Sequence, residues 1–244
     1  MEVDEQAREG APPAPVSEDP IDPQRAHDHE ERRQPLLQRE RDALIDELAG
    51  EGIEDARVLE AMRQVPRHEL IPRRSWSRAY VDTALPIGEG QTISQPYIVA
   101  LMTQLAQIEP DDVVLEVGTG SGYQAAVLSK LAAEVYTIEI VEPLAVRARE
   151  GLERMGIADE IHFRIGDGYR GWPEAAPFDA IVVTAAPPRI PEPLRQQLKV
   201  GGRMVIPVGV DHQELMLLER TAEGMEQRDV IPVRFVPMTG KAQR

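Results

Sequence analysis

Apolar residues along this chain recur with two different periods, and the change between them separates two regions. From Leu36 to Gly50, leucine and isoleucine recur near the spacing of one helix face, and the glycine ends the run. The same pattern predicts helices over residues 55–64 and 95–107. Between these helices, residues 67–94 hold Pro and Gly at short intervals, which predicts a loop-rich segment.

Beyond residue 112, short apolar runs alternate with amphipathic stretches. The runs predict strands at residues 113–117, 135–139, 161–165, 178–183 and 203–207. The amphipathic stretches predict helices at residues 123–131, 144–155 and 191–198. This alternation predicts an α/β fold with a doubly wound, mostly parallel sheet. Residues 214–219 and 230–236 read as successive strands without a helix between them, which predicts an antiparallel addition at one edge.

Residues 1–34 lack this patterning. They hold ten acidic residues, four arginines and five prolines, with almost no large apolar side chains. Such a segment buries too little apolar surface to offset the entropy lost on ordering. We therefore predict a disordered, acidic, Pro-rich tail over residues 1–34 and one α/β domain over residues 35–244. His27, Asp28 and His29 could ligate a metal, but a solvated tail explains them more simply, and no metal site is expected.

The composition narrows the classes of partner. The 244-residue chain carries a formal net charge of -15 and has no basic run longer than a dipeptide. Nucleic-acid binding draws on clustered Lys and Arg, so we expect no nucleic-acid partner. The apolar runs are far shorter than the ~20 residues that cross a bilayer, and the N-terminus is acidic. No membrane association is expected, and the default location is cytoplasmic. The lack of Cys excludes disulfides and a Cys nucleophile.

A glycine-rich turn follows the first of the predicted parallel strands, with Gly118, Gly120 and Gly122 at alternate positions. Open α/β sheets bind ligands at the carboxyl ends of their strands, and glycine lets a ligand approach the backbone. A dinucleotide fingerprint would need its third glycine at position 123, where this chain has Tyr123. Glu116 would repel a pyrophosphate and suits the sulfonium and ammonium groups of S-adenosylmethionine. An NAD(P)-dependent oxidoreductase, or a tight turn without a ligand, are the alternatives.

Two further acidic residues follow the next strands of the predicted sheet. Glu139 closes the second strand, where its carboxylate can accept hydrogen bonds from both ribose hydroxyls of a nucleoside. Asp167, followed by Gly168, lies in a loop at the same edge and could accept from an adenine amino group. A solvated Glu and a plain Asp-Gly turn are the competing interpretations.

Three further segments are similar to the protein-L-isoaspartate O-methyltransferase family. They are residues 84–96, with Gln91-Thr92-Ile93-Ser94-Gln95-Pro96, residues 179–188, and residues 233–237. The similarity extends over about residues 37–240. It implies a Rossmann-like methyltransferase fold with N-terminal helices and S-adenosylmethionine as cofactor. The implied substrates are proteins and peptides that contain L-isoaspartyl residues, methylated on the free α-carboxylate. The ester then collapses to a succinimide, and its hydrolysis returns some normal Asp.

The resemblance also assigns roles to single residues. It implies that the Ser94 hydroxyl and the backbone at Ile93 orient the substrate carboxylate, while Gln91, Thr92 and Ile93 lie along the cofactor. Ser94 could instead cap the helix that begins at Gln95, and the two roles are compatible. An isoaspartyl carboxylate is already ionised at neutral pH, so positioning can replace a general base or a metal.

Four other side chains near these segments have less definite roles. A lone histidine such as His68 is usually structural or solvated. Trp76 and Tyr80 could line a substrate cleft or simply pack a loop, and Arg234 could pair with a substrate carboxylate or reach solvent. A methyltransferase of the same fold that acts on a small molecule or RNA, and a binding module without catalysis, are the remaining alternatives.

Overall fold

A computed structural model describes residues 23–243 of the chain, with side chains from residue 33 onward. Within the described residues, the boundary between the two units of the chain lies between Leu36 and Leu37. Helix α1 (Pro23–Gly50) crosses it, so residues 23–34, predicted to belong to the disordered tail, are helical. Arg, Glu, Gln and Ala dominate that stretch and form helices without an apolar face, and Pro23 suits a first turn. Residues 1–22, and the side chains of His27, Asp28 and His29, lie outside the described part.

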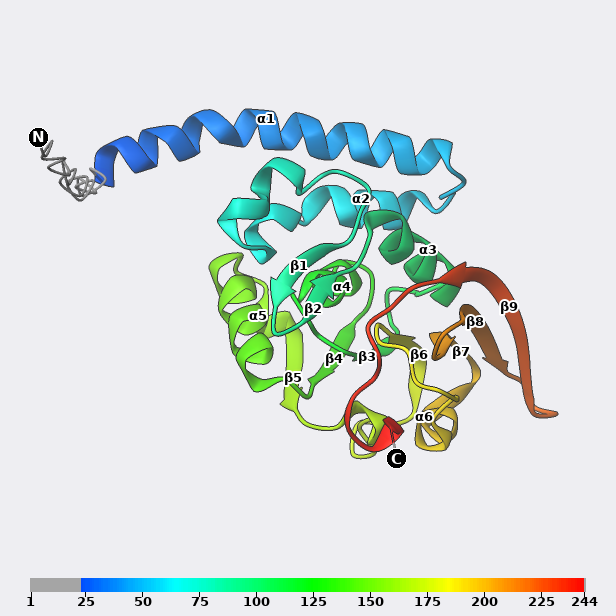
Figure 1. Cartoon of the computed structure of the whole chain (residues 1–244). Coiled ribbons are helices and arrows are strands. Elements are labelled where there is room, and N and C mark those ends of the chain that lie inside the picture. Colours follow the sequence, from blue (N-terminus) through cyan, green and yellow to red (C-terminus); the bar gives the residue numbers. More distant parts are fainter. Residues whose placement is uncertain (1–22, 244) are drawn as a thin grey trace, which may run out of the picture. The chain divides into compact units, whose positions relative to one another are not determined.

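The second unit contains a seven-stranded sheet with the order β5-β4-β3-β6-β7-β8-β9 (Figure 1). The strands are β3 (Val113–Val117), β4 (Glu134–Glu139), β5 (Ile161–Ile165), β6 (Phe178–Val183), β7 (Leu198–Gly209), β8 (Gln213–Arg220) and β9 (Met225–Val233). The first five pair in parallel, and β8 and β9 extend the sheet antiparallel. This confirms the doubly wound, mostly parallel sheet with an antiparallel C-terminal edge.

Helices and apolar side chains cover the two faces of the sheet differently. Along β3, Val114 belongs to one apolar cluster and Leu115 to another, because successive side chains of a strand point to opposite faces. Helices α3 (Pro96–Ala106), α4 (Tyr123–Leu128) and α5 (Glu142–Arg154) pack on the first face. Helix α6 (Glu192–Gln197) packs against β7 on the second. Glu116, two residues after Val114, therefore faces the side of α3 and α4.

The segment predicted to be loop-rich contains short regular elements. Strands β1 (Leu85–Gly88) and β2 (Gln91–Ile93) form an antiparallel hairpin. Two 3-10 helices, η1 (Arg67–Leu70) and η2 (Arg73–Arg78), precede it. Pro86 and the glycines of the turn hide the alternation by which a hairpin is predicted, so the sequence pattern missed it.

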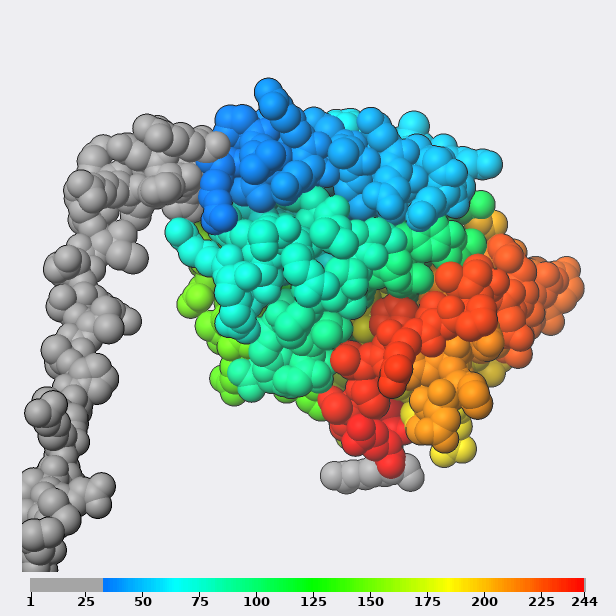
Figure 2. All heavy atoms as spheres, turned by 45° about the horizontal axis from the view of Figure 1, so that its top comes forward, coloured from blue at the N-terminus to red at the C-terminus, as the bar shows by residue number. Residues whose placement is uncertain are grey.

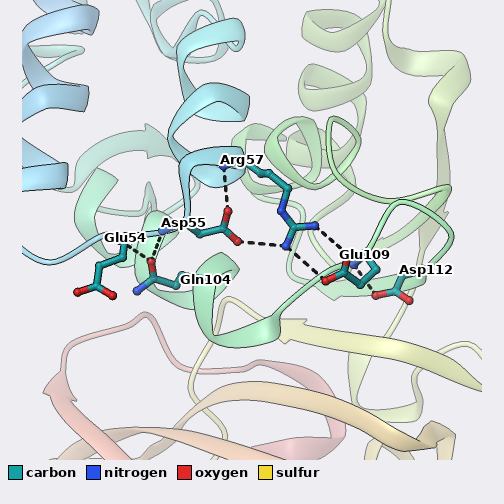
Figure 3. A network of polar contacts seen from close by, with 6 residues as sticks. All are labelled: Glu54, Asp55, Arg57, Gln104, Glu109 and Asp112. Atoms are coloured by element: carbon teal, nitrogen blue, oxygen red, sulfur yellow. Dashed lines mark hydrogen bonds and ion pairs between the residues drawn. The ribbon is translucent and has the colours of Figure 1, made fainter.

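A polar network joins helix α2 (Ala56–Gln64) to the end of α3 (Figure 3). The Gln104 side-chain oxygen accepts from the backbone N–H groups of Glu54 and Asp55, at 2.7 and 2.8 Å. Asp55 in turn caps α2 by accepting from the Arg57 N–H at 2.9 Å. Arg57 then forms an ion pair with Glu109, in the loop before β3. These contacts fix the helices that precede the sheet.

Three short 3-10 helices complete the chain. They are η3 (Ala158–Glu160), η4 (Gly168–Arg170) and η5 (Gly240–Gln243). Across the described residues, no helix has the length and apolar character needed to span a membrane. Within that same range, no three His, Cys, Asp or Glu side chains are grouped so that they could hold a metal ion.

Candidate functional site

The carboxyl ends of β3, β4 and β6 open into a cavity at the middle of the sheet. β3 pairs with β4 on one side and with β6 on the other, which is the switch point where open α/β sheets bind ligands. The candidate residues that line it are Gln91, Thr92, Ile93, Ser94, Glu116, Gly118, Gly120, Glu139 and Gly168. Gly122 and Asp167 do not line it.

The glycines of the turn after β3 have different tasks. Gly118 adopts φ +102°, and a Cβ there would lie 2.5 Å from the hydroxyl oxygen of Thr184. Gly120, at φ +53°, leaves its side open to the cavity, since a Cβ would touch only Ile87 and Gly118, at 3.8 and 3.9 Å. Gly122 instead faces α5, where a Cβ would meet Leu152 at 3.0 Å. Gly122 is therefore a packing glycine, while Gly118 and Gly120 form the cavity wall.

The Glu139 carboxylate holds the turn and faces the cavity. One of its oxygens accepts from the Gly120 N–H and the other from the Val141 N–H, both at 2.8 Å. Its side chain is almost completely buried. A carboxylate has about four acceptor positions, so each oxygen can still accept a hydrogen bond from a ligand. The Glu139 carboxylate is therefore placed so that it can accept hydrogen bonds from ribose hydroxyls, which is the role that the sequence predicts.

Glu116 differs from the anionic residue that the sequence predicts. It is completely buried, and burial, with a smaller contribution from Glu139, raises its pKa to about 8. With a pKa near 8, Glu116 is mainly protonated at neutral pH. Thr137 donates to Oε2, whereas Oε1 has no hydrogen-bond partner among the described residues. A cationic group next to that oxygen would favour the ionised form.

Ser94 lies where the cavity meets an adjoining groove. The groove is lined by Ala84, Thr92, Ser94, Gln95, Ile98, Thr184 and residues 232–236. Ser94 does not cap α3: the N-cap residue is Gln95, and Pro96 occupies the first turn. The Tyr97 N–H donates instead to the Asp82 carboxylate, at 2.7 Å. Within residues 33–243 the Ser94 hydroxyl forms no hydrogen bond, so it can bind a ligand.

The end of the chain closes one side of the cavity. Residues 236–239 belong to its lining, and we call residues 236–241 the C-terminal strap. Ala186, after β6, donates to the carbonyl of Val236 at 2.9 Å and accepts from the Met238 N–H at 2.8 Å. The strap appears in red in Figure 2, beside the teal and green atoms of the segment that carries β1 and β2. The groove that Ser94 lines lies between the segment that carries β1 and β2 and residues 232–236, which lead into the strap.

Asp167 joins the strap to the loop after β5. Its carboxylate accepts from the Tyr169 N–H at 3.0 Å and from the Lys241 N–H at 2.9 Å. Both bonds run to backbone, and Asp167 does not line the cavity. Its neighbour Gly168 does, and a Cβ there would lie 2.4 Å from Val117. The role of Asp167 toward an adenine amino group stays a prediction.

The four other candidate side chains lie in two places. His68, Trp76 and Tyr80 are buried together outside the cavity lining, and the His68 ring nitrogen bonds the Tyr80 hydroxyl at 2.7 Å. These three residues pack the segment before β1. Arg234 lines the adjoining groove beside Ser94. Only Arg234 is thus placed where a ligand in the groove could reach it.

Several residues of the cavity were not singled out from the sequence. They include Val99, Thr119, Ser121, Tyr123, Gln124, Ile138, Ile140, Val141, Thr184, Ala185 and residues 236–239. Thr184 directly follows the predicted strand 178–183, so its position at the carboxyl edge could have been inferred. Val236 and Pro237 belong to the segment 233–237 that resembles the family, whereas no local signal marks Met238 and Thr239, which only the tertiary fold brings to the cavity.

Comparison with known proteins gives consistent matches. Residues 39–243 match the family model for protein-L-isoaspartate(D-aspartate) O-methyltransferase. Protein-L-isoaspartate O-methyltransferase 2 of Polaromonas sp. is 59% identical over 190 residues, which cover 77% of this chain and 90% of that protein. The protein-L-isoaspartate O-methyltransferase of Halorhodospira halophila is 55% identical, with coverages of 82% and 92%.

Solved structures agree with these matches. A protein-L-isoaspartate O-methyltransferase superposes with a TM-score of 0.76 at 30% identity, covering 83% of this chain and 67% of its own. A candidate enzyme of the same name from Plasmodium falciparum, crystallised with S-adenosyl-L-homocysteine, gives a TM-score of 0.73 at 27% identity. That match covers 82% of this chain and 98% of the Plasmodium chain.

Proposed function

Because the chain belongs to the protein-L-isoaspartate(D-aspartate) O-methyltransferase family, we propose that its cavity holds S-adenosylmethionine and that Ser94 orients the acceptor carboxylate. The enzyme methylates the free α-carboxylate of L-isoaspartyl residues in damaged proteins and peptides, which starts repair through a succinimide. The observation that carries the assignment of Ser94 is its position. Its uncommitted hydroxyl lies at the junction of the glycine-lined cavity and the groove.

The residues of the cavity fit the cofactor. The unpartnered Oε1 of buried Glu116 suits a cationic group, and the Glu139 carboxylate can accept from ribose hydroxyls. Gly120 leaves room for a ligand against the backbone, while Gly118 lets the Thr184 hydroxyl approach the turn. S-adenosylmethionine supplies an electrophilic methyl group on a positively charged sulfur. The chain supplies the shape and the charges that hold it.

The acceptor side has to bind and orient a carboxylate. One carboxylate oxygen forms the new bond to the methyl carbon as the carbon–sulfur bond breaks, so no proton has to move. The Ser94 hydroxyl can donate to the other oxygen, and the N-terminus of α3 beside it favours negative charge. Holding the two reactants in line supplies much of the rate, because well-oriented groups reach high effective molarities.

The groove fits an extended peptide. Its walls are two chain segments, with Thr92, Ser94 and Gln95 on one side and residues 232–236 on the other. Arg234 lies on the second wall, where its guanidinium can pair with a carboxylate of the substrate. We expect protein and peptide substrates rather than nucleic acid, in keeping with the net charge of -15.

The test is methyl transfer to two peptides of the same sequence, one with an L-isoaspartyl residue and one with a normal aspartyl residue. We expect transfer from labelled S-adenosylmethionine to the isoaspartyl peptide, and a methyl ester detectable by mass spectrometry. Equal transfer to both peptides, or to neither, contradicts the proposed function. Calorimetric titration with NAD and with S-adenosylhomocysteine separates the oxidoreductase alternative, since only the second compound should bind.

A further inference from the structure

A buried arginine outside the cavity holds the backbone of Ser94. Arg67, at the start of η1, has no solvent-exposed surface. Its Nη2 donates to the carbonyl of Ser94 at 2.7 Å and to that of Thr83 at 3.3 Å, and its Nε donates to that of Ala79 at 3.0 Å. One side chain thus joins the end of η2, the loop before β1, and the residue proposed to bind the acceptor.

The same guanidinium also reaches the donor side of the site. It lies over the ring of Tyr123, with its central carbon 4.9 Å from the ring centroid. Tyr123 begins α4, directly after the glycine turn, and lines the cavity. Arg67 therefore spans the distance between the segment that carries the acceptor-binding serine and the turn that bounds the cofactor cavity.

Burying the charged guanidinium of Arg67 is unfavourable, so its three hydrogen bonds to backbone carbonyls have to compensate for the lost hydration. Among the described residues, the nearby Asp82 carboxylate offsets part of the burial of Arg67 without forming a salt bridge to it, and the buried Nη1 has no hydrogen-bond partner. Burial lowers the pKa of Arg67 to about 10, so it is still charged at neutral pH. Burying a charge without a salt-bridge partner is unfavourable, because the charge loses its hydration. An apolar side chain would fill the space more cheaply but would leave three carbonyls without a donor.

A second restraint acts on the next residues of the same turn. Asp82 accepts from the Gln95 side-chain amide at 2.6 Å and from the Tyr97 N–H at 2.7 Å. Arg67 holds the Ser94 carbonyl from one side while Asp82 holds the start of α3 from the other. The backbone on both sides of the Ser94 side chain is therefore held, by Arg67 at the Ser94 carbonyl and by Asp82 at the first turn of α3, and Ser94 itself lines the groove.

We propose that Arg67 is a positioning residue for methyl transfer: by holding the Ser94 carbonyl against the Tyr123 end of the glycine turn, it sets the acceptor in line with the donor. This inference rests on the proposed function of Ser94. A guanidinium suits the task because its donors form a rigid, planar fork. A displacement of about 1 Å in a reacting group can cost on the order of 100-fold in rate.

The substitution Arg67→Lys tests this, since lysine keeps the charge and its attraction to the Tyr123 ring but not the planar fork. We expect kcat for the isoaspartyl peptide to fall about 10- to 100-fold, with the peptide KM changed less than about threefold. The Kd for S-adenosylhomocysteine should stay within about threefold, because the cavity wall is intact. Calorimetric stoichiometry gives the fraction of competent sites, so kcat is expressed per folded, binding-competent molecule.

The matched control is Arg63→Lys, one turn earlier on α2. Arg63 forms only partly exposed ion pairs, such as that with Asp42 at 2.9 Å, so its replacement should leave kcat near the wild-type value.

Arg67→Gln, which removes the buried charge and keeps one amide donor, provides a second variant if Arg67→Lys does not fold. A folded variant at position 67 with kcat within twofold of wild type overturns the proposal. So does a fall in kcat matched by an equal loss of S-adenosylhomocysteine binding. Wild-type protein that fails to distinguish the isoaspartyl from the aspartyl peptide contradicts the proposed function instead.

Discussion

At the residue scale, the two carboxylates of the cofactor cavity differ because their surroundings differ. Glu139 accepts two backbone hydrogen bonds at the cavity wall. Glu116 is completely buried with one unpartnered oxygen, and its pKa rises to about 8. The sequence shows two acidic residues at strand ends but not their burial, which depends on α4 packing over β3 and β4 and on α3 packing over the neighbouring β6. Their positions could be predicted, whereas the protonation state of Glu116 could not.

The raised pKa of Glu116 has a consequence for stability. The unfolded chain releases this proton near pH 4.5 and the folded chain near pH 8, so the folded state holds one more proton between these values. The contribution of Glu116 to stability is therefore lost progressively as pH rises from about 4.5 to about 8. Glu116→Gln keeps the size and the acceptor for Thr137 but does not titrate. In urea unfolding without ligand, we expect the variant to gain stability relative to wild type from pH 5.5 to pH 8.5. A stability difference that is independent of pH would contradict the assignment.

At the element scale, the first turn of α3 is capped by a residue that is distant in the sequence. The sequence offers Ser94 as the cap, because serine before an early proline is a common helix start. Asp82 provides the cap instead and leaves the Ser94 hydroxyl uncommitted. A cap supplied across 15 residues leaves no local sequence signal, and neither does the bond from Arg67 to the Ser94 carbonyl. The helix itself was predictable, because its apolar face repeats along the chain.

Asp82→Ala should separate the structural part of this cap from its functional part. Loss of a cap costs about 1 kcal/mol, and in a domain of this size that lowers Tm by about 2–4 °C. Asp55→Ala removes the comparable cap of α2, far from the groove, and should cost about as much stability. We expect kcat/KM for the isoaspartyl peptide to fall about tenfold in Asp82→Ala and to be unchanged in Asp55→Ala. Equal activity of the two variants would show that the α3 cap does not position Ser94.

At the scale of the whole molecule, the last residues of the chain complete a cavity that begins at β3. The mostly parallel sheet and its antiparallel edge follow from the alternation of apolar runs, and the sequence predicts both correctly. The strap has no such pattern. Asp167 and Lys241 are 74 residues apart, and their bond forms only when the complete sheet brings them together. The glycine turn was therefore predictable as one wall of the site, while the strap that faces it was not.

Lys241→Pro tests whether the strap retains the cofactor. Proline removes the N–H that donates to Asp167, and the first turn of η5 accommodates its backbone. We expect S-adenosylhomocysteine to dissociate about tenfold faster, since a hydrogen bond to a charged group contributes about 1.5–3 kcal/mol. Lys241→Ala is the control, because it keeps the N–H and loses only the contact with the Tyr169 ring. Equal dissociation rates for the two variants in stopped-flow measurements would contradict a retaining role of this bond.

The central claim is that the uncommitted hydroxyl of Ser94 orients the acceptor carboxylate beside the donor site. Steady-state kinetics of Ser94→Ala with the isoaspartyl peptide, together with calorimetry of S-adenosylhomocysteine binding, test it most directly. Ser129→Ala is the control, since the Ser129 hydroxyl donates to the carbonyl of Ala126 at the end of α4 and lies outside the lining of the cavity and the groove. Loss of a hydrogen bond to a charged group should lower kcat/KM about 10- to 100-fold while the Kd for S-adenosylhomocysteine changes little. A Ser94→Ala enzyme with the kcat/KM of wild type would contradict the claim.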